Sequence, residues 1–144
     1  MTTQTDVRDR LASRVEDLHA MVSLVSGDVS PAGERFLKDY GYWPVEPDGC
    51  PDVTDAAWEI AGSYVLDARV LYRAEDSRRV VSRVELLLTC GGPTEVIVWD
   101  ERGAGWSGYL YSWSDPAGAD FLGSEDYDVV TDFLRAFIVP DLEG

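Results

Sequence analysis

The stretch VVSRVELLLTCGGP, residues 80–93, decides how the chain folds. Up to Cys90 its apolar side chains occupy alternate positions, and Arg83 and Glu85 fall between them. Alternation with a period of two is typical of a β-strand that turns one face toward a hydrophobic core. The closing Gly-Gly-Pro breaks the strand, because glycine favours turns and proline lacks the backbone N–H that a sheet needs. We therefore expect a strand that ends in a turn.

Further strands are predicted on both sides of this stretch. Residues 64–72 alternate in the same way, and the turn at 75–78 joins the two strands as a β-hairpin. Downstream, the short runs at 96–99 and 106–113 are separated by the glycine-containing turn at 101–105. Four strands joined by short turns predict an antiparallel meander.

Helices are predicted before these strands. Apolar residues that recur three and four positions apart from Val7 to Val25 indicate an amphipathic helix, with Thr5 as its cap and Gly27 at its end. Two shorter helices are expected next. One begins after Ser30-Pro31 and runs to Gly41, and the other covers 52–62 with Thr54 as a possible cap.

A last helix is predicted after the strands. Ser124 is expected to cap it, and its apolar stripe over 130–138 ends before Pro140. The fold class is therefore α+β, with N-terminal helices, a four-stranded antiparallel meander and a C-terminal helix packed on the sheet.

One domain is the expectation for a chain of 144 residues. We predict a single domain over 1–144. Its helical part covers 1–62, in which the proline-rich segment 43–51 forms a stiff connector. The antiparallel sheet and the terminal helix cover 63–144.

The formal net charge of −15 is concentrated in two parts of the chain. Residues 39–63 carry six carboxylates and no basic residue, and residues 103–144 carry eight carboxylates and Arg135 alone. A field of one sign attracts partners of the opposite sign and repels nucleic acid. The predicted partner is therefore a basic protein, and direct nucleic-acid binding is not expected.

The second acidic part supplies the candidate binding site. Spacings of three and four place Glu125, Asp128 and Asp132 on one face of the last helix, and a loop is expected before it. The carboxylates assigned to the site are Asp115, Asp120, Glu125, Asp126, Asp128 and Asp132. Duplex DNA carries one negative charge per about 1.7 Å of axis. A surface with closely spaced carboxylates presents a comparable field and is therefore suited to bind a basic groove in place of DNA. A solvated face that serves only solubility is the alternative interpretation.

Aromatic residues of the fourth predicted strand complete the candidate site. Tyr109, Tyr111 and Trp113 share one face of that strand, and Tyr and Trp commonly anchor protein contacts. Packing in the core or in cross-strand pairs is the alternative for this stripe. Trp99 and Trp106 are expected in the core.

No catalytic or cofactor-binding motif occurs in the sequence. There is no nucleophile elbow, phosphate loop or dinucleotide fingerprint, and His19 is expected at the surface or the boundary of the first helix. The acids lack the spacing of a calcium loop, and Cys50 and Cys90 lack that of a zinc site. We therefore expect no enzyme activity, no cofactor and no metal. The state of the two thiols is left open.

The chain has no pattern of a membrane protein. Its N-terminus lacks an apolar signal region, and no run of about 18 apolar residues occurs. We expect a cytoplasmic protein with no membrane span, as a monomer or a homodimer.

The order of motifs over residues 58–138 resembles small proteins that phages, plasmids and other mobile elements encode. The run Glu-Leu-Leu-Leu-Thr-Cys-Gly-Gly-Pro at 85–93, followed by a short apolar strand, an aromatic strand and a final helix, carries the resemblance. It implies an accessory protein, such as the small acidic anti-restriction and anti-CRISPR proteins. The layout is also similar to immunity proteins that neutralise bacterial toxins. No catalytic residue transfers from either group.

Charge and resemblance together predict a non-enzymatic inhibitor that binds the basic site of a nucleic-acid-handling protein. Its most concrete form is an anti-defence protein of a phage or mobile element, directed at a nuclease, a CRISPR effector or a restriction subunit. An immunity protein against a toxin is one alternative. A structural or housekeeping domain whose acidity serves only solubility is the other.

Overall fold

The computed structural model describes residues 4–45, 52–89, 95–100, 108–112, 115–121, 123–140 and 142. Within these ranges the helices are α1 (Gln4–Val25), α2 (Pro31–Asp39), α3 (Val53–Tyr64) and α4 (Ser124–Phe137). The strands are β1 (Asp67–Glu75), β2 (Arg78–Thr89), β3 (Glu95–Asp100), β4 (Gly108–Ser112) and β5 (Asp115–Phe121). Several predictions fall outside the described residues. These are the predictions on Cys50, Cys90, Trp106 and Trp113, on residues 46–51 of the connector, on the Gly-Gly-Pro break and on the turn at 101–105.

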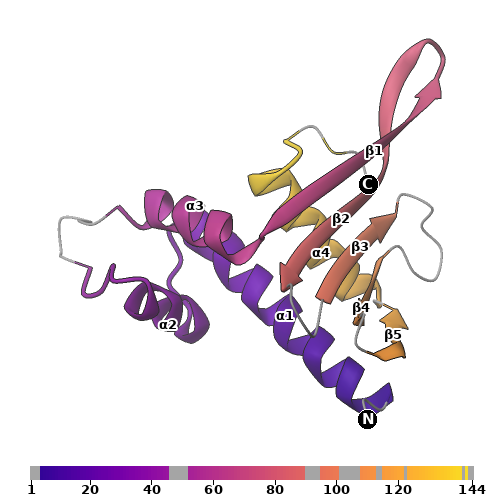
Figure 1. Ribbon diagram of the computed structural model, residues 1–144. Coiled ribbons are helices and arrows are strands. Elements are labelled where there is room, and N and C mark those ends of the chain that lie inside the picture. Colours follow the sequence, from indigo (N-terminus) through magenta and orange to yellow (C-terminus); the bar gives the residue numbers. More distant parts are fainter. Residues whose placement is uncertain are drawn as a thin grey trace.

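The strands form one antiparallel sheet in the order β1-β2-β3-β4-β5, so that each strand lies beside its neighbours in sequence (Figure 1). The predicted α+β class and the antiparallel meander are confirmed. The predicted number of four strands is wrong, because Asp115–Phe121, expected as a loop, pairs with β4 as a fifth strand. This segment contains proline, glycine and two aspartates, which are depleted in strands but tolerated at a sheet edge.

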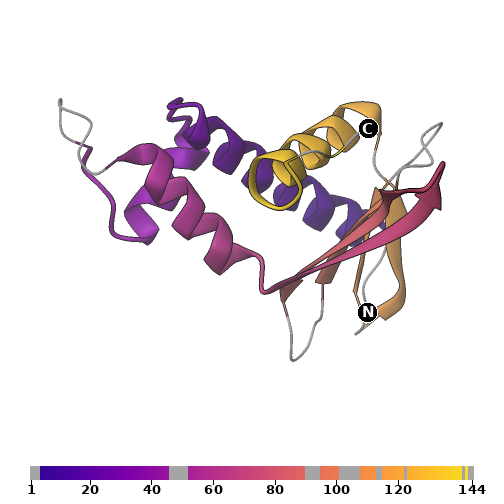
Figure 2. The same ribbon diagram turned by 90° about the horizontal axis from the view of Figure 1, so that it is seen from above.

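Helices α1 and α4 lie together on one face of the sheet, as Figure 2 shows. Helix α1 contacts β4 and β5, and α4 contacts β3, so the predicted packing of the C-terminal helix on the sheet is confirmed. One hydrophobic core joins these layers. Its largest fully buried side chains are Leu18, Met21, Leu24, Leu37, Ile60, Leu86, Ile97, Trp99, Phe133 and Leu134.

Trp99 fixes α4 on the central strand β3. Its side chain is 1% exposed, which confirms the predicted core position. The indole Nε1–H donates a hydrogen bond to Oγ1 of Thr131 at 2.9 Å. The indole ring also stacks on Tyr127, with 6.0 Å between centroids and 11° between planes. A buried indole N–H needs an acceptor, so the Trp99–Thr131 bond favours one position of α4 over β3.

Two predicted helix boundaries are confirmed by the backbone. Ser30 caps α2, because its hydroxyl accepts a hydrogen bond from the backbone N–H of Gly33 at 3.0 Å, and Pro31 is the first helical residue. Gly27 follows α1 with φ of 86°, a left-handed conformation that glycine adopts without strain.

Three predicted caps are wrong. Thr5 lies inside α1, which begins at Gln4. Asp52 caps α3, since its carboxylate accepts from the backbone N–H of Thr54 at 2.9 Å. Gly123, rather than Ser124, is the N-cap of α4 and offers no side-chain acceptor. Ser, Thr and Asp all suit a cap position, so sequence alone does not choose among close neighbours.

Strand β1 begins three residues later than predicted, and its pairing with β2 shifts register once. Helix α3 continues through Tyr64, so β1 starts at Asp67. The register against β2 shifts between Leu71 and Tyr72. The shift leaves Ser82 of β2 without a partner in the register, so the extra residue of this bulge belongs to β2. Tyr72 of β1 is 48% exposed.

Replacing Thr131 by Val tests the hydrogen bond that holds Trp99. Val keeps the shape of the side chain but leaves the buried indole N–H without its acceptor, so the free energy of unfolding should fall by about 1–3 kcal/mol. Thr131→Ser keeps the hydroxyl, so its free energy of unfolding should fall by less than that of Thr131→Val. Urea unfolding followed by tryptophan fluorescence measures both variants. Equal losses would contradict a stabilising role for this bond.

Candidate functional site

The exposed face of α4 carries a row of carboxylates. At about 100° per helical residue, Glu125, Asp128 and Asp132 lie within a sector of about 60°. All three side chains are exposed. Among the described residues, no ion pair involves any of them. We call these three residues the acidic ridge, and its charge is available to a partner.

The other acids assigned to the site do not join the acidic ridge. Asp126 is half-buried on another side of α4. Asp115 and Asp120, expected in a loop, are part of strand β5. The register pairs Asp120 with Leu110 and Leu110 with the core residue Ile97. Asp120 therefore occupies a position on the helix-facing side of the sheet.

The register places Tyr109 and Tyr111 on the opposite side of the sheet. They pair with Val98 and Val96 of β3, which alternate with the core positions of that strand. Trp113, the third residue of the predicted stripe, lies outside the described residues. Helix α4 and the two tyrosine positions are thus on opposite faces of the sheet, so these two described members of the stripe do not share a surface with the acidic ridge.

A partly buried polar network, which sequence analysis did not find, joins α1, α3 and β3. Arg14 donates from Nε to Oε2 of Glu95 at 2.9 Å, and from Nη1 to the hydroxyl of Tyr64 at 3.0 Å. The Tyr64 hydroxyl donates to Oδ2 of Asp17 at 2.7 Å. The Glu95 side chain is only 7% exposed. These groups are far apart in sequence, so the only sequence signal is a carboxylate directly before the apolar run of β3.

The network shifts the pKa of two of its members. Burial raises the pKa of the Tyr64 hydroxyl; the hydrogen bond from Arg14 opposes this shift, and the bond to Asp17 adds to it. Burial alone lowers the pKa of Arg14, but the hydrogen bonds and charges of Tyr64 and Glu95 outweigh it, and the pKa is raised. Both groups therefore keep their protons at neutral pH.

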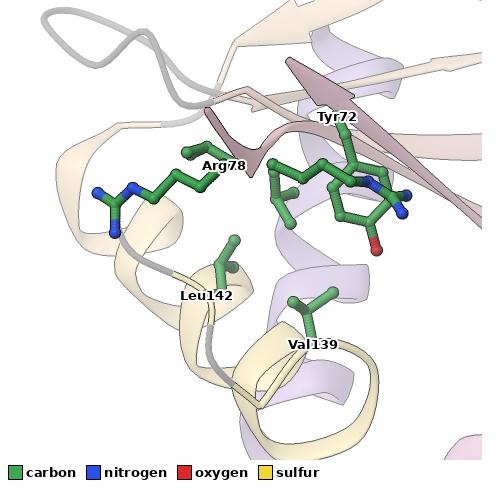
Figure 3. A pocket seen from close by; sticks show the side chains of 7 residues that line it. Tyr72, Arg78, Val139 and Leu142 are labelled. Carbon is green, nitrogen blue, oxygen red and sulfur yellow. The ribbon is translucent and has the colours of Figure 1, made fainter. Parts of the chain in front are cut away.

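The β1–β2 hairpin borders a hollow of about 180 Å³ that carries two arginines. Tyr72, Arg78 and Arg79 meet Val139 and Leu142 there (Figure 3). The guanidinium of Arg79 lies over the Tyr72 ring, 4.2 Å from its centroid. Arg78 points away from Tyr72 (Figure 3). The arginines diverge, so they do not form the convergent fork that binds an anion.

An apolar groove of about 170 Å³ lies between α3, α4 and the start of β1. Its lining includes Trp58, Ala61, Val65, Ala68, Phe133 and Phe137. Trp58 is 49% exposed and meets Phe137 edge to face, with 5.0 Å between the ring centroids. An exposed tryptophan beside an apolar groove is typical of a protein-contact surface.

Comparison with family models, with curated proteins and with solved structures finds no match for this chain. In the part of the chain that the structure describes, no three His, Cys, Asp or Glu side chains are grouped as metal ligands. None of the described helices has the length and apolar character of a membrane span. His19 is exposed on α1, as predicted. Function is therefore inferred from the acidic ridge, the network and the groove.

The raised pKa of Tyr64 predicts a loss of stability at alkaline pH. The folded protein holds the phenol proton more tightly than the unfolded chain, so this contribution to stability is complete below about pH 10 and declines as the pH rises further. The free energy of unfolding should therefore fall more steeply above about pH 10 in the wild type than in Tyr64→Phe. Tyr40→Phe, which removes an exposed phenol, is the matched control. Equal slopes for wild type and Tyr64→Phe would refute the assignment.

Proposed function

We propose that the protein acts by binding, as a non-enzymatic acidic inhibitor that occupies the basic site of a nucleic-acid-handling protein. The observation that carries this proposal is the acidic ridge. Glu125, Asp128 and Asp132 are exposed on one side of a single helix, and no ion pair among the described residues engages them. A row of unpaired carboxylates is suited to a partner of opposite charge.

The charge of the whole chain supports the same partner chemistry. The net charge of −15 adds a long-range field to that of the acidic ridge. Such a field raises the rate of encounter with a basic surface, and salt screens it over about 10 Å at 0.1 M ionic strength. Association with the partner should therefore be fast at low salt and weaken as salt is added.

The spacing of the acidic ridge suits a site that is built for nucleic acid. At about 1.5 Å of rise per residue, its carboxylates follow one another at about 4.5 and 6 Å along the helix axis. Phosphates follow one another at about 3.4 Å along each strand of DNA. The ridge therefore offers charges at a comparable spacing to a groove lined by Lys and Arg. The most concrete form of the proposal is an anti-defence protein of a phage or mobile element that blocks a nuclease, CRISPR effector or restriction subunit.

Affinity capture of the tagged protein from a lysate of its host tests the proposal. A basic nucleic-acid-handling protein should be retained at low salt and released at high salt, with mass spectrometry as the readout. The variant Glu125→Gln/Asp128→Asn/Asp132→Asn should lose that partner. Substitutions on an exposed surface change stability by only about 0.5 kcal/mol each, so loss of the partner reports on the ridge.

A matched control removes three exposed carboxylates elsewhere. Asp9→Asn/Glu16→Gln/Asp28→Asn changes the net charge by the same amount and leaves the acidic ridge intact. This control should retain the partner. Equal losses in both variants would mean that net charge alone attracts the partner, and no loss in the ridge variant would contradict the proposal. A retained toxin would instead favour an immunity protein.

A further inference from the structure

Strand β1 forms an edge of the sheet. The contacts of α1 and α4 with the sheet centre on β3, β4 and β5. Strand β1 pairs with β2 on one side, and no described strand lies on its other side. An open strand edge presents unpaired backbone N–H and C=O groups and is a template for another strand.

The apolar groove lies at this open edge. Ala68 of β1 lines it together with residues of α3 and α4. Ala68 pairs with Leu86, which pairs with Ile97, so Ala68 is on the helix-facing side of the sheet. The groove volume of about 170 Å³ is below the ~300–1,000 Å³ typical of small-molecule sites. It is therefore suited to one apolar side chain of a protein partner.

The two most exposed large apolar side chains of the described residues, Leu66 and Trp58, lie at the start of β1 and in the groove. Leu66 is 56% exposed, Trp58 is 49% exposed and Tyr72 is 48% exposed. Leu66 directly precedes β1 and Trp58 lines the groove, whereas Tyr72 lies farther along β1, in the hairpin hollow under Arg79. Exposed apolar side chains that gather at one place mark contact surfaces, whereas scattered ones carry no such meaning.

The Asp67 side chain caps a backbone N–H group at the start of β1. The N–H of Ala68 donates a hydrogen bond to Oδ1 of Asp67 at 2.9 Å, in an exposed position. Charged side chains at an edge strand protect it against uncontrolled pairing. A backbone carbonyl of an added strand would replace the Asp67 carboxylate as acceptor of the Ala68 N–H, and a basic side chain of that strand would form an ion pair with the freed carboxylate.

We propose that the open edge of β1 is a docking site for an extended, basic segment of a partner protein, which adds to β1 as a further strand and places an apolar side chain in the groove. The inference rests on the proposed function, whose partner is basic. Strand addition supplies affinity through backbone hydrogen bonds, and pockets for alternate side chains supply specificity.

The exposed carboxylates around the groove and the start of β1 favour a basic segment as the occupant. Asp55 and Glu59 are exposed on α3 on either side of Trp58 in sequence, and Asp67 is exposed at the start of β1. The arginines of β1 are already engaged: Arg69 is 3.9 Å from a Glu85 carboxylate oxygen, and Arg73 is paired with Glu75. A second copy of the chain would bring another net charge of −15 to this edge, which disfavours it as the occupant.

Synthetic peptides are the probes for this site, with the full chain as the receptor. A peptide of about eight residues, a usual strand length, alternates Val and Lys. A second peptide has the same sequence with N-methyl groups on alternate backbone amides, and a third has the same composition in scrambled order. The alternating peptide should bind in isothermal titration calorimetry. N-methylation and scrambling should each weaken binding by at least about tenfold, because strand addition needs backbone N–H groups and alternation.

Gly62 offers a way to fill the groove without disturbing the fold. It lines the groove, is exposed, and has no atom within 4 Å of the place that a Cβ would take. Glycine is also a poor residue inside a helix, so Gly62→Phe should leave α3 intact, which circular dichroism checks. Gly62→Phe should weaken binding of the alternating peptide by at least about tenfold. Ser63→Phe, at an exposed neighbour outside the groove lining, should bind it as the wild type does.

Several outcomes would overturn the docking site. These are no binding of the alternating peptide, equal binding of its N-methylated form, or equal effects of Gly62→Phe and Ser63→Phe. Self-association in analytical ultracentrifugation that Gly62→Phe abolishes would assign the edge to a second copy instead. The acidic ridge variant should still bind the peptide. If the alternating peptide does not bind, but capture of the partner still depends on the acidic ridge, this inference is overturned and the proposed function stands.

Discussion

The contact between Arg14 and Glu95 joins the helical layer to the central strand of the sheet. Glu95 begins β3, whose six residues are all buried, and Arg14 also reaches the Tyr64 hydroxyl at the end of α3. A buried carboxylate without its partner is costly, so this pair favours one position of α1 over the sheet. Because α1 contacts both α3 and α4, the placement of both helices depends on it. The apolar groove between them follows from that placement, and it lies beside the edge of β1 that no described strand pairs with.

The parts of the fold that depend on local periodicity were predicted from the sequence. Alternation identified the β1–β2 hairpin, and the three-and-four spacing identified α1 and the apolar stripe of α4. The fifth strand was missed because its composition favours a loop, and only pairing with β4 at the sheet edge makes it a strand. Register shifts are equally non-local. The shift between Leu71 and Tyr72, at which β2 carries the extra residue Ser82, has no signal in the alternation of the sequence.

In the candidate site, too, the local features were predicted from the sequence and the non-local ones were not. Glu125, Asp128 and Asp132 were correctly placed on one face of a helix, because helical spacing is a local property. Their grouping with Asp120 and the tyrosines depended on sheet register, which puts these positions on opposite faces. The network of Arg14 and the apolar groove were not predicted, since their members come together only in the tertiary structure. In the proposed mechanism the acidic ridge supplies long-range attraction, and the edge of β1 supplies short-range contact.

Competition between this protein and duplex DNA for the captured partner tests whether the protein occupies the basic site of that partner. The partner is first bound to fluorescent DNA and is then titrated with the wild-type protein or with the acidic ridge variant. If the protein occupies the basic site, the wild type should release the DNA as it binds, and the ridge variant should release far less. A ternary complex, in which the partner holds DNA and this protein together, would contradict the claim.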